Sequence, residues 1–209
     1  MTGGAPPTGD RPVWILGSGN RHKFDEVAAL LAAAPIELRP LPAGFAMPEE
    51  TGATLLANAR LKARAVAAAT GALALADDTG LEVDALGGEP GVRSSRYAGE
   101  HVTYADNNRL LLERLRGIHG VNRRARFRCV LVLADAAGKE VTAEGKVEGF
   151  ILDEPRGEAG FGYDPLFLPE GGERTLAELT AAEKNALSHR ARAAEALLAS
   201  LRKLGRWAP

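Results

Sequence analysis

The chain of 209 residues is 45% hydrophobic, 25% charged and 5% aromatic, and its formal net charge is −1. A length of this order suits one domain of fair size or two small lobes, and the balanced charge argues against a protein that mainly coats nucleic acid. The single cysteine, Cys129, excludes an intrachain disulfide framework and a cysteine-based zinc cluster.

The N-terminal residues 1–12, "MTGGAPPTGDRP", read as a disordered tail. They lack the apolar core of a signal peptide, and no apolar run in the chain approaches the roughly 20 residues of a membrane span. We therefore expect a cytoplasmic protein whose partner is neither a membrane nor a nucleic acid.

Strands and helices are expected to alternate after this tail. Residues 13–17, "VWILG", predict a buried strand, and an apolar stripe over residues 24–31 predicts the helix that follows. A second strand is expected within residues 36–41, and a long alanine-rich helix over residues 51–70, closed by the next glycine. The apolar run 73–76, "LALA", predicts a third strand.

The pattern changes in the middle of the chain. Residues 87–100 read as a loop and residues 103–117 as a helix. Residues 125–135 and 140–152 then alternate apolar and polar side chains on either side of the turn "AAGK". This alternation predicts a long antiparallel hairpin.

The C-terminal part begins with the glycine-rich segment 157–172. Residues 175–204 predict a helix, in which Thr180 and Glu183 are spaced as a capping box. No internal repeat or linker separates independent domains. Helices that alternate with strands around a central hairpin indicate an α/β fold with a mixed sheet and flanking helices.

Carboxylates gather where the apolar run 73–76 stops. Asp77 and Asp78 follow it directly, and Glu82 and Asp84 end the next short apolar stretch. Because side chains alternate along a strand, Asp77 and Asp78 cannot both point into the same core. A lone aspartate here would usually cap a turn, but this number of carboxylates favours a Mg²⁺ site beside a phosphorylated substrate.

A second source of oxygen ligands is the pair Glu49 and Glu50, in the loop before the long helix. The candidate metal ligands are therefore Asp77, Asp78, Glu49 and Glu50.

Glycines and cations favour the binding of a polyphosphate. The segment 17–23, "GSGNRHK", joins a strand to a helix, so that its backbone N–H groups can approach an anion at the helix N-terminus. It matches neither the P-loop pattern nor the dinucleotide-binding pattern. Lys23 lies one turn into that helix, and Lys62 and Arg64 lie on the next one. Together with the acidic ligands, these cations favour a metal-bound polyphosphate.

A third cluster comes from residues 160–165, "GFGYDP", and residues 184–190, "KNALSHR". An aromatic ring beside glycines offers a stacking face to a base, and Asp164, His189 and Arg190 can form hydrogen bonds with its edge. A glycine-rich turn and a polar helix start remain as the alternative interpretation.

Six segments, taken in this order, resemble the inosine/xanthosine triphosphate pyrophosphatase family, the Ham1-like proteins. They are "SGNRHK", "EETG…ANARLKA", "ADDTGLEVDALGGEPGVRSSRYAG", "ARFRCVLVL", "GFGYDPLF" and "ELTAAEKNALSHRARA". The match runs from about Val13 to Leu204. Ser18 stands where many members carry threonine, and Thr79 replaces a common serine, so both hydroxyl groups are kept.

This resemblance implies a housecleaning enzyme. Its members hydrolyse noncanonical purine nucleoside triphosphates, namely ITP, dITP and XTP, to the monophosphate and pyrophosphate, and they use Mg²⁺. They are homodimers with a central cleft between two lobes of an α/β fold, which would place a single two-lobed domain over residues 13–207 here.

The resemblance also implies roles for individual residues. Asp78 would be the catalytic proton acceptor and a metal ligand, and one of Glu49 and Glu50 would complete the metal site. The segment Ser18–Lys23 would bind the triphosphate, Lys62 would add to this positive wall, and the C-terminal residues would hold the nucleoside. The residues implied to bind substrate are Ser18, Gly19, Asn20, Arg21, His22, Lys23, Lys62, Thr79, Phe161, Gly162, Tyr163, Asp164, Lys184, His189 and Arg190.

Other interpretations stay open at this point. A Maf-like nucleotide pyrophosphatase would have a similar fold and reaction with a different base preference. A non-catalytic nucleotide sensor would bind ITP without turning it over. An RNA-binding module would use the arginines between Arg109 and Arg128, although the balanced net charge argues against it.

Overall fold

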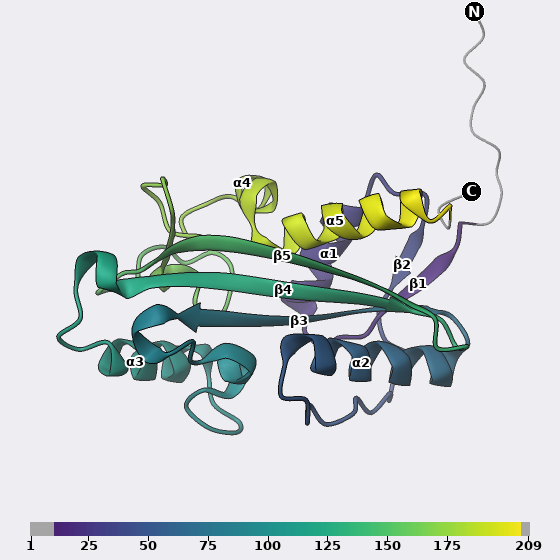
Figure 1. Cartoon of the computed structure of the whole chain (residues 1–209), viewed down its shortest axis with the longest axis horizontal. Coiled ribbons are helices and arrows are strands. Elements are labelled where there is room, and N and C mark those ends of the chain that lie inside the picture. Colours follow the sequence, from purple (N-terminus) through teal and green to yellow (C-terminus); the bar gives the residue numbers. More distant parts are fainter. Residues whose placement is uncertain (1–10, 206–209) are drawn as a thin grey trace, which may run out of the picture.

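A computed structural model describes residues 11–205 of the chain, and six strands form one mixed sheet in the order β2-β1-β3-β4-β5-β6 (Figure 1). Strand β1 is parallel to β2 and β3, whereas β3, β4, β5 and β6 pair antiparallel. The predicted α/β fold with a mixed sheet is therefore confirmed. Most of the predicted disordered tail, residues 1–10, lies outside the described residues. The strands are β1 (Val13–Leu16), β2 (Glu37–Arg39), β3 (Leu73–Val83), β4 (Arg124–Ala134), β5 (Glu140–Ile151) and β6 (Phe167–Pro169); the helices are α1 (Arg21–Leu31), α2 (Leu55–Thr70), α3 (Tyr104–Arg114), α4 (Ala181–Leu187) and α5 (His189–Lys203).

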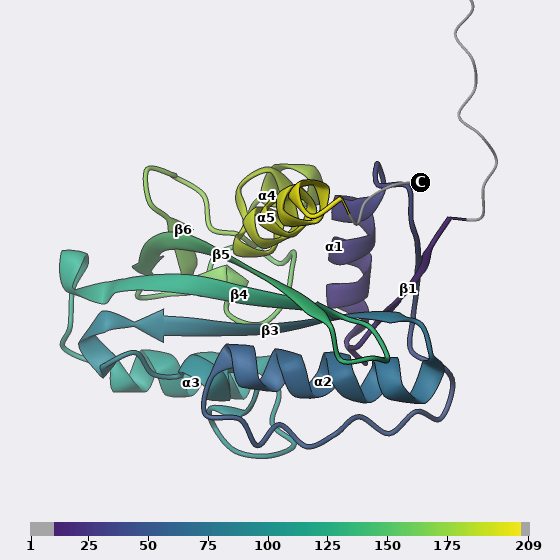
Figure 2. The same ribbon diagram turned by 45° about the vertical axis from the view of Figure 1, so that its right-hand side comes forward.

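Helices cover both sides of the long strands. In two views α2 and α3 lie on one side of β3, β4 and β5, and α1, α4 and α5 lie on the other (Figures 1 and 2). The long hairpin is confirmed, since β4 and β5 pair from Arg124↔Phe150 to Ala134↔Glu140. No helix in the described part of the chain is long and apolar enough to cross a membrane.

Two hydrophobic clusters occupy opposite ends of the long strands. At one end the pair Leu75↔Leu133 packs with α1 and α5, and at the other end the pair Leu81↔Phe127 packs with α3 and the segment 163–179. Asp77, Asp78 and Thr79 lie on β3 between these ends. The sheet therefore carries its charged residues in the interval between two cores.

The prediction that the third strand stops at Asp77 is wrong. Strand β3 continues through Val83, and Asp77 and Asp78 pair with Leu131 and Val130 of β4 in mid-strand. The two aspartates suggested the end of the strand, because burying a carboxylate costs free energy unless it is paired. Both aspartates have cationic partners from distant parts of the chain, so the strand can continue.

Two predicted helices have different bounds in the structure. Helix α2 begins at Leu55 and not at residue 51, because the Thr54 side chain accepts the N–H of Ala57 as its N-cap. The C-terminal segment is helical only from Ala181, and Ser188, with ψ of 159°, ends α4 and caps α5. The capping box of Thr180 and Glu183 is confirmed, whereas the single helix over residues 175–204 is wrong.

Candidate active site

A cavity of about 390 Å³ opens beside the middle of β3 and gathers residues from all parts of the chain. The predicted site residues that line it are Ser18, Gly19, Asn20, Lys23, Glu50, Lys62, Asp78, Thr79, Phe161, Gly162, Tyr163, Asp164, Lys184, His189 and Arg190. It is also lined by residues that the sequence analysis did not single out, which are Met47, Pro48, Val92, Ser94, Ser95, Tyr104 and Phe127.

Four predicted site residues do not line this cavity: Arg21, His22, Glu49 and Asp77. Arg21 is exposed and pairs with Asp25 one turn along α1. Glu49 is exposed. Of the two glutamates that the sequence left as alternatives, Glu50 is therefore the one at the cavity.

Asp77 points toward α1 and α5. Its Oδ2 lies 3.1 Å from Lys23 Nζ and 3.1 Å from a guanidinium nitrogen of Arg190, and its side chain is fully buried. The Thr79 hydroxyl donates to the same oxygen at 3.2 Å. Burial alone would raise the pKa of Asp77, but the charges of Lys23 and Arg190 hold it far below its usual value. Asp77 is thus a permanently charged anchor for two cations.

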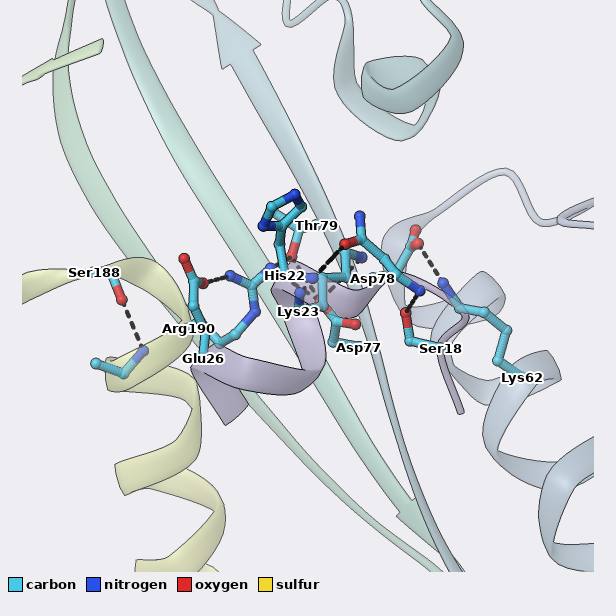
Figure 3. Close-up of polar contacts among 12 residues, drawn as sticks. Ser18, His22, Lys23, Glu26, Lys62, Asp77, Asp78, Thr79, Ser188 and Arg190 are labelled. Carbon is cyan, nitrogen blue, oxygen red and sulfur yellow. Dashed lines mark hydrogen bonds and ion pairs between the residues drawn. The ribbon is translucent and has the colours of Figure 1, made fainter. Parts of the chain in front are cut away.

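Asp78 points toward α2, on the opposite face of the strand. Its Oδ1 lies 2.8 Å from Lys62 Nζ, which also binds Glu50 Oε1 at 2.7 Å, and Figure 3 shows Lys62 reaching Asp78 from α2. Burial raises the pKa of Asp78 above its usual value, against the opposing charge of Lys62. For Glu50 burial acts in the same direction, but Lys62 and Arg96 outweigh it and lower the pKa. Asp78 therefore has the higher proton affinity that suits a general base.

The first turn of α1 forms another wall of the cavity. Asn20 is the N-cap of α1, and its Oδ1 accepts the N–H groups of His22 and Lys23 at 3.0 and 3.3 Å. The Ser18 hydroxyl accepts the N–H of Asn20 at 3.2 Å. This fixed helix N-terminus beside the ammonium group of Lys23 is suited to bind an anion.

The C-terminal residues form a buried chain of alternating charges. Lys184 Nζ binds Asp164 Oδ2 and Glu26 Oε1, each at 2.6 Å. Glu26 on α1 also pairs with Arg190 on α5 (Figure 3), and Arg190 in turn binds Asp77. The charges on this side of the cavity are therefore compensated within the protein.

Aromatic rings lie beside these charges. Lys184 Nζ is 4.9 Å from the centre of the Phe161 ring, and the His22 ring stacks on Phe161 at 5.4 Å. His189 stacks on Phe127 at 4.8 Å. Burial holds the pKa of His189 well below its usual 6.5, and the charges of Arg190 and Lys184 act in the same direction. His189 is therefore neutral at pH 7.

Some functional positions were missed in the sequence. No pattern in the sequence pointed to Glu26 or Arg96, because their partners Lys184 and Glu50 are more than forty residues away. Asn58 lies four residues before Lys62 on α2, so helical spacing could have placed it on the same face.

The carboxylates at the cavity fit Mg²⁺ in its common binding mode. Among residues 11–205, no group of three or more His, Cys, Asp and Glu side chains is arranged to hold a metal. Magnesium, however, is usually bound through one or two carboxylates together with substrate phosphates and water. Asp78 and Glu50 meet at one ammonium group beside the cavity and provide such a pair. Asp77 does not line the cavity, and its carboxylate is bound by Lys23 and Arg190.

Comparison with known proteins identifies the family. The model of the Ham1 family matches residues 14–200. A dITP/XTP pyrophosphatase of Thermus thermophilus is 54% identical over 187 residues, which cover 88% of this chain and 89% of that protein. One of Elusimicrobium minutum is 51% identical over 187 residues, which cover 87% and 95%. The structure of a HAM1 protein from Coxiella burnetii is similar with a TM-score of 0.81 and 42% identity, over 92% of this chain and 99% of that one. The resemblance seen in the motifs is confirmed, and the chain belongs to the Ham1 family.

Proposed function

We propose that this protein hydrolyses the noncanonical purine nucleoside triphosphates ITP, dITP and XTP to the monophosphate and pyrophosphate, and so removes them from the nucleotide pool. Relatives at about half identity carry the name dITP/XTP pyrophosphatase. The observation that carries the proposal is the cavity itself. It is lined by the buried carboxylate of Asp78, by residues at the N-terminus of α1 and by the aromatic ring of Phe161.

In this proposal Asp78 accepts the proton of the attacking water. Its raised pKa makes it a better base than an exposed aspartate. The ammonium group of Lys62 keeps Asp78 and Glu50 together, and Lys23 with the α1 N-terminus binds the triphosphate. When Mg²⁺ is bound, it neutralises phosphate charge and orients the phosphate for in-line attack. Asp78 and Glu50 are the residues that would hold it.

The base would lie against Phe161, with His189 and Arg190 at its edge. Hypoxanthine and xanthine have a 6-keto group and an N1–H, whereas adenine has an amino group and no N1 hydrogen. A donor from His189 or Arg190 to O6 would therefore be left unpaired by adenine, and such mismatches cost factors of roughly 10⁴ when the groups are well buried. We therefore expect ITP, dITP and XTP to be far better substrates than ATP. Guanine shares the 6-keto group and the N1–H and differs from hypoxanthine only by its 2-amino group, so the expected preference over GTP rests on the family resemblance and not on these two side chains.

The same proposal places the protein in the cytoplasm as a homodimer. The homodimer follows from the family resemblance alone, whereas the cytoplasmic location is the expectation drawn from the sequence. Light scattering at working concentration should give twice the chain mass of 22.0 kDa. A fully active monomer would refute the dimer and leave the hydrolysis intact.

The test is the Asp78→Asn variant. The amide is nearly isosteric but is a poor proton acceptor, so turnover of ITP should fall on the order of 10²–10⁴-fold while the nucleotide still binds. Turnover is measured as phosphate release with added inorganic pyrophosphatase, and binding by calorimetry.

The matched control is Asp84→Asn, which makes the same change just past the end of β3 at a side chain that is 45% exposed and does not line the cavity. Near-normal turnover of a folded Asp78→Asn variant would remove Asp78 from the mechanism. Wild-type protein that binds ITP without turnover would be a sensor, and better turnover of methylated GTP than of ITP would indicate a Maf-like enzyme.

A further inference from the structure

A buried amide on α2 contacts both sides of the acidic site. Asn58 is fully buried. Its Oδ1 accepts the N–H of Gly52 at 2.7 Å, and its Nδ2 donates to Asp78 Oδ2 in a long hydrogen bond of 3.5 Å. No assigned role in hydrolysis or substrate binding accounts for this residue.

Asn58 and Lys62 share the carboxylate of Asp78. They are four residues apart on α2, so they lie on one face of the helix, one turn apart. Lys62 binds Oδ1 and Asn58 binds Oδ2. With a donor from the same rigid helix on each oxygen, the plane of the carboxylate cannot rotate freely.

The other end of the amide holds the loop that carries Glu50. Gly52 passes so close to the first turn of α2 that a Cβ there would lie 2.5 Å from Asn58 Oδ1 and 2.7 Å from Ala57 Cβ. Only glycine fits this approach. Glu50 is two residues earlier, and it is also bound by Arg96 at 3.0 Å. The Asn58 amide therefore links the backbone of the Glu50 loop to Asp78.

We propose that Asn58 is a positioning residue for hydrolysis, which holds Asp78 and the Glu50 loop in one fixed arrangement through the two ends of its amide. The inference rests on the proposed function, since it assigns to Asp78 and Glu50 the chemistry described there. Because Asn58 does not line the cavity, its loss should lower kcat with little change in KM. Groups that orient metal-binding side chains typically contribute 10–100-fold to activity, and we expect a loss of about this size.

Two substitutions separate the two ends of the amide. Asn58→Asp keeps an acceptor for the Gly52 N–H but replaces the donor to Asp78 by a carboxylate. Asn58→Ala removes both interactions. The Gly52 amide should therefore stay protected from hydrogen exchange in Asn58→Asp and exchange faster in Asn58→Ala, and kcat for ITP should fall in both. The exchange measurement uses the protein without nucleotide or metal.

Asn107→Ala is the matched control. Asn107 is a buried amide on α3 that bonds the Ala98 N–H at 2.8 Å and the Ser95 carbonyl at 3.1 Å, and it contacts neither Asp78 nor Glu50. Its loss should lower the free energy of unfolding to a similar degree without the same fall in kcat.

The outcomes separate this inference from the proposed function. Failure of the wild-type protein to hydrolyse ITP would refute the proposed function, whatever the variants do. If the wild type is active, a fall in kcat no larger in Asn58→Asp and Asn58→Ala than in Asn107→Ala would overturn the inference, as would unchanged exchange of Gly52 in Asn58→Ala. If Asn58→Ala fails to fold, the kcat and KM of Asn58→Asp, compared with those of Asn107→Ala, still test the inference.

Discussion

Asp77 and Asp78 are neighbours in sequence but belong to two different charge networks. The alternation of side chains along a strand predicted that they could not share a core, and the structure places Asp77 against α1 and α5 and Asp78 against α2. The sequence pattern could not identify the ion-pair partners of the two aspartates, because Arg190, for example, lies 113 residues from Asp77 in the chain. Residue types and spacing therefore predicted that both aspartates belong to one candidate site, but their division between the Lys23–Arg190 network and the Lys62 network required the fold.

His189 makes a testable contribution to the pH dependence of stability. Its pKa is well below 6.5 in the folded protein, because its burial and the nearby Arg190 and Lys184 disfavour the charged form. The unfolded chain binds the proton more tightly, so stability from this residue is complete above about pH 6.5 and is lost as the pH falls below it. Between about pH 7.5 and pH 5.5 this loss amounts to about 1.4 kcal/mol of the free energy of unfolding.

Urea unfolding of the nucleotide-free protein at these two pH values measures the effect. His189→Gln cannot titrate, so its pH-dependent loss should be smaller than that of the wild type by about this amount. His119→Gln, at a side chain that is 75% exposed, is the control and should keep the wild-type difference. Equal pH dependence in all three proteins would mean that His189 accepts a proton in the folded state.

At the scale of the elements, the long hairpin and most helices followed from periodicity, while boundaries depended on tertiary contacts. Helix α2 starts where Thr54 caps it, and the loop before it brings the N–H of Gly52 to the side chain of Asn58. The C-terminal apolar pattern continues through Ser188, yet the helix breaks there. This break starts α5 at His189 and Arg190, and both line the cavity.

Ser188 should therefore matter for stability and for substrate binding. Its hydroxyl accepts the N–H of Ala191 at 3.2 Å as the N-cap of α5. Ser188→Ala should lower the free energy of unfolding by about 1 kcal/mol and raise KM for ITP, because the first turn that carries His189 loses its cap. Ser200→Ala is the control, since Ser200 bonds the Ala196 carbonyl within the same helix. If Ser188→Ala and Ser200→Ala have the same KM for ITP and the same free energy of unfolding, the cap does not hold His189 in place for substrate binding.

At the scale of the whole molecule, the candidate site lies on the sheet between the two hydrophobic clusters. Each buried charge near the cavity has a partner of opposite sign, from Asp164 through Lys184, Glu26 and Arg190 to Asp77. Such pairing offsets the cost of desolvating the charges, so a near-neutral chain can concentrate ionic groups in its interior without an excess of either sign.

Contacts between the start of α1 and other elements also lie beside the cavity. Asn20 at the start of α1 donates from Nδ2 to the hydroxyl of Tyr104 at the start of α3, at 3.1 Å. Also in the first turn of α1, the ring of His22 stacks on the ring of Phe161, with an angle of 16° between the ring planes. The family resemblance implied that His22 binds the triphosphate, whereas in the structure its ring stacks on Phe161, a residue implied to hold the nucleoside.

A base that stacks on the face of Phe161 that His22 covers must replace the imidazole ring. An aromatic pair contributes about 0.5–1.5 kcal/mol, so His22→Ala should tighten the binding of ITP by about two- to tenfold. Inorganic triphosphate has no base, and its binding should not change. Both dissociation constants are measured by calorimetry on wild type, His22→Ala and Arg21→Ala, the last being an exposed neighbour on the same turn that does not line the cavity. Weaker binding of ITP and of inorganic triphosphate to His22→Ala would instead place the imidazole at the phosphates, and weaker binding of ITP alone would show that it packs on the bound base.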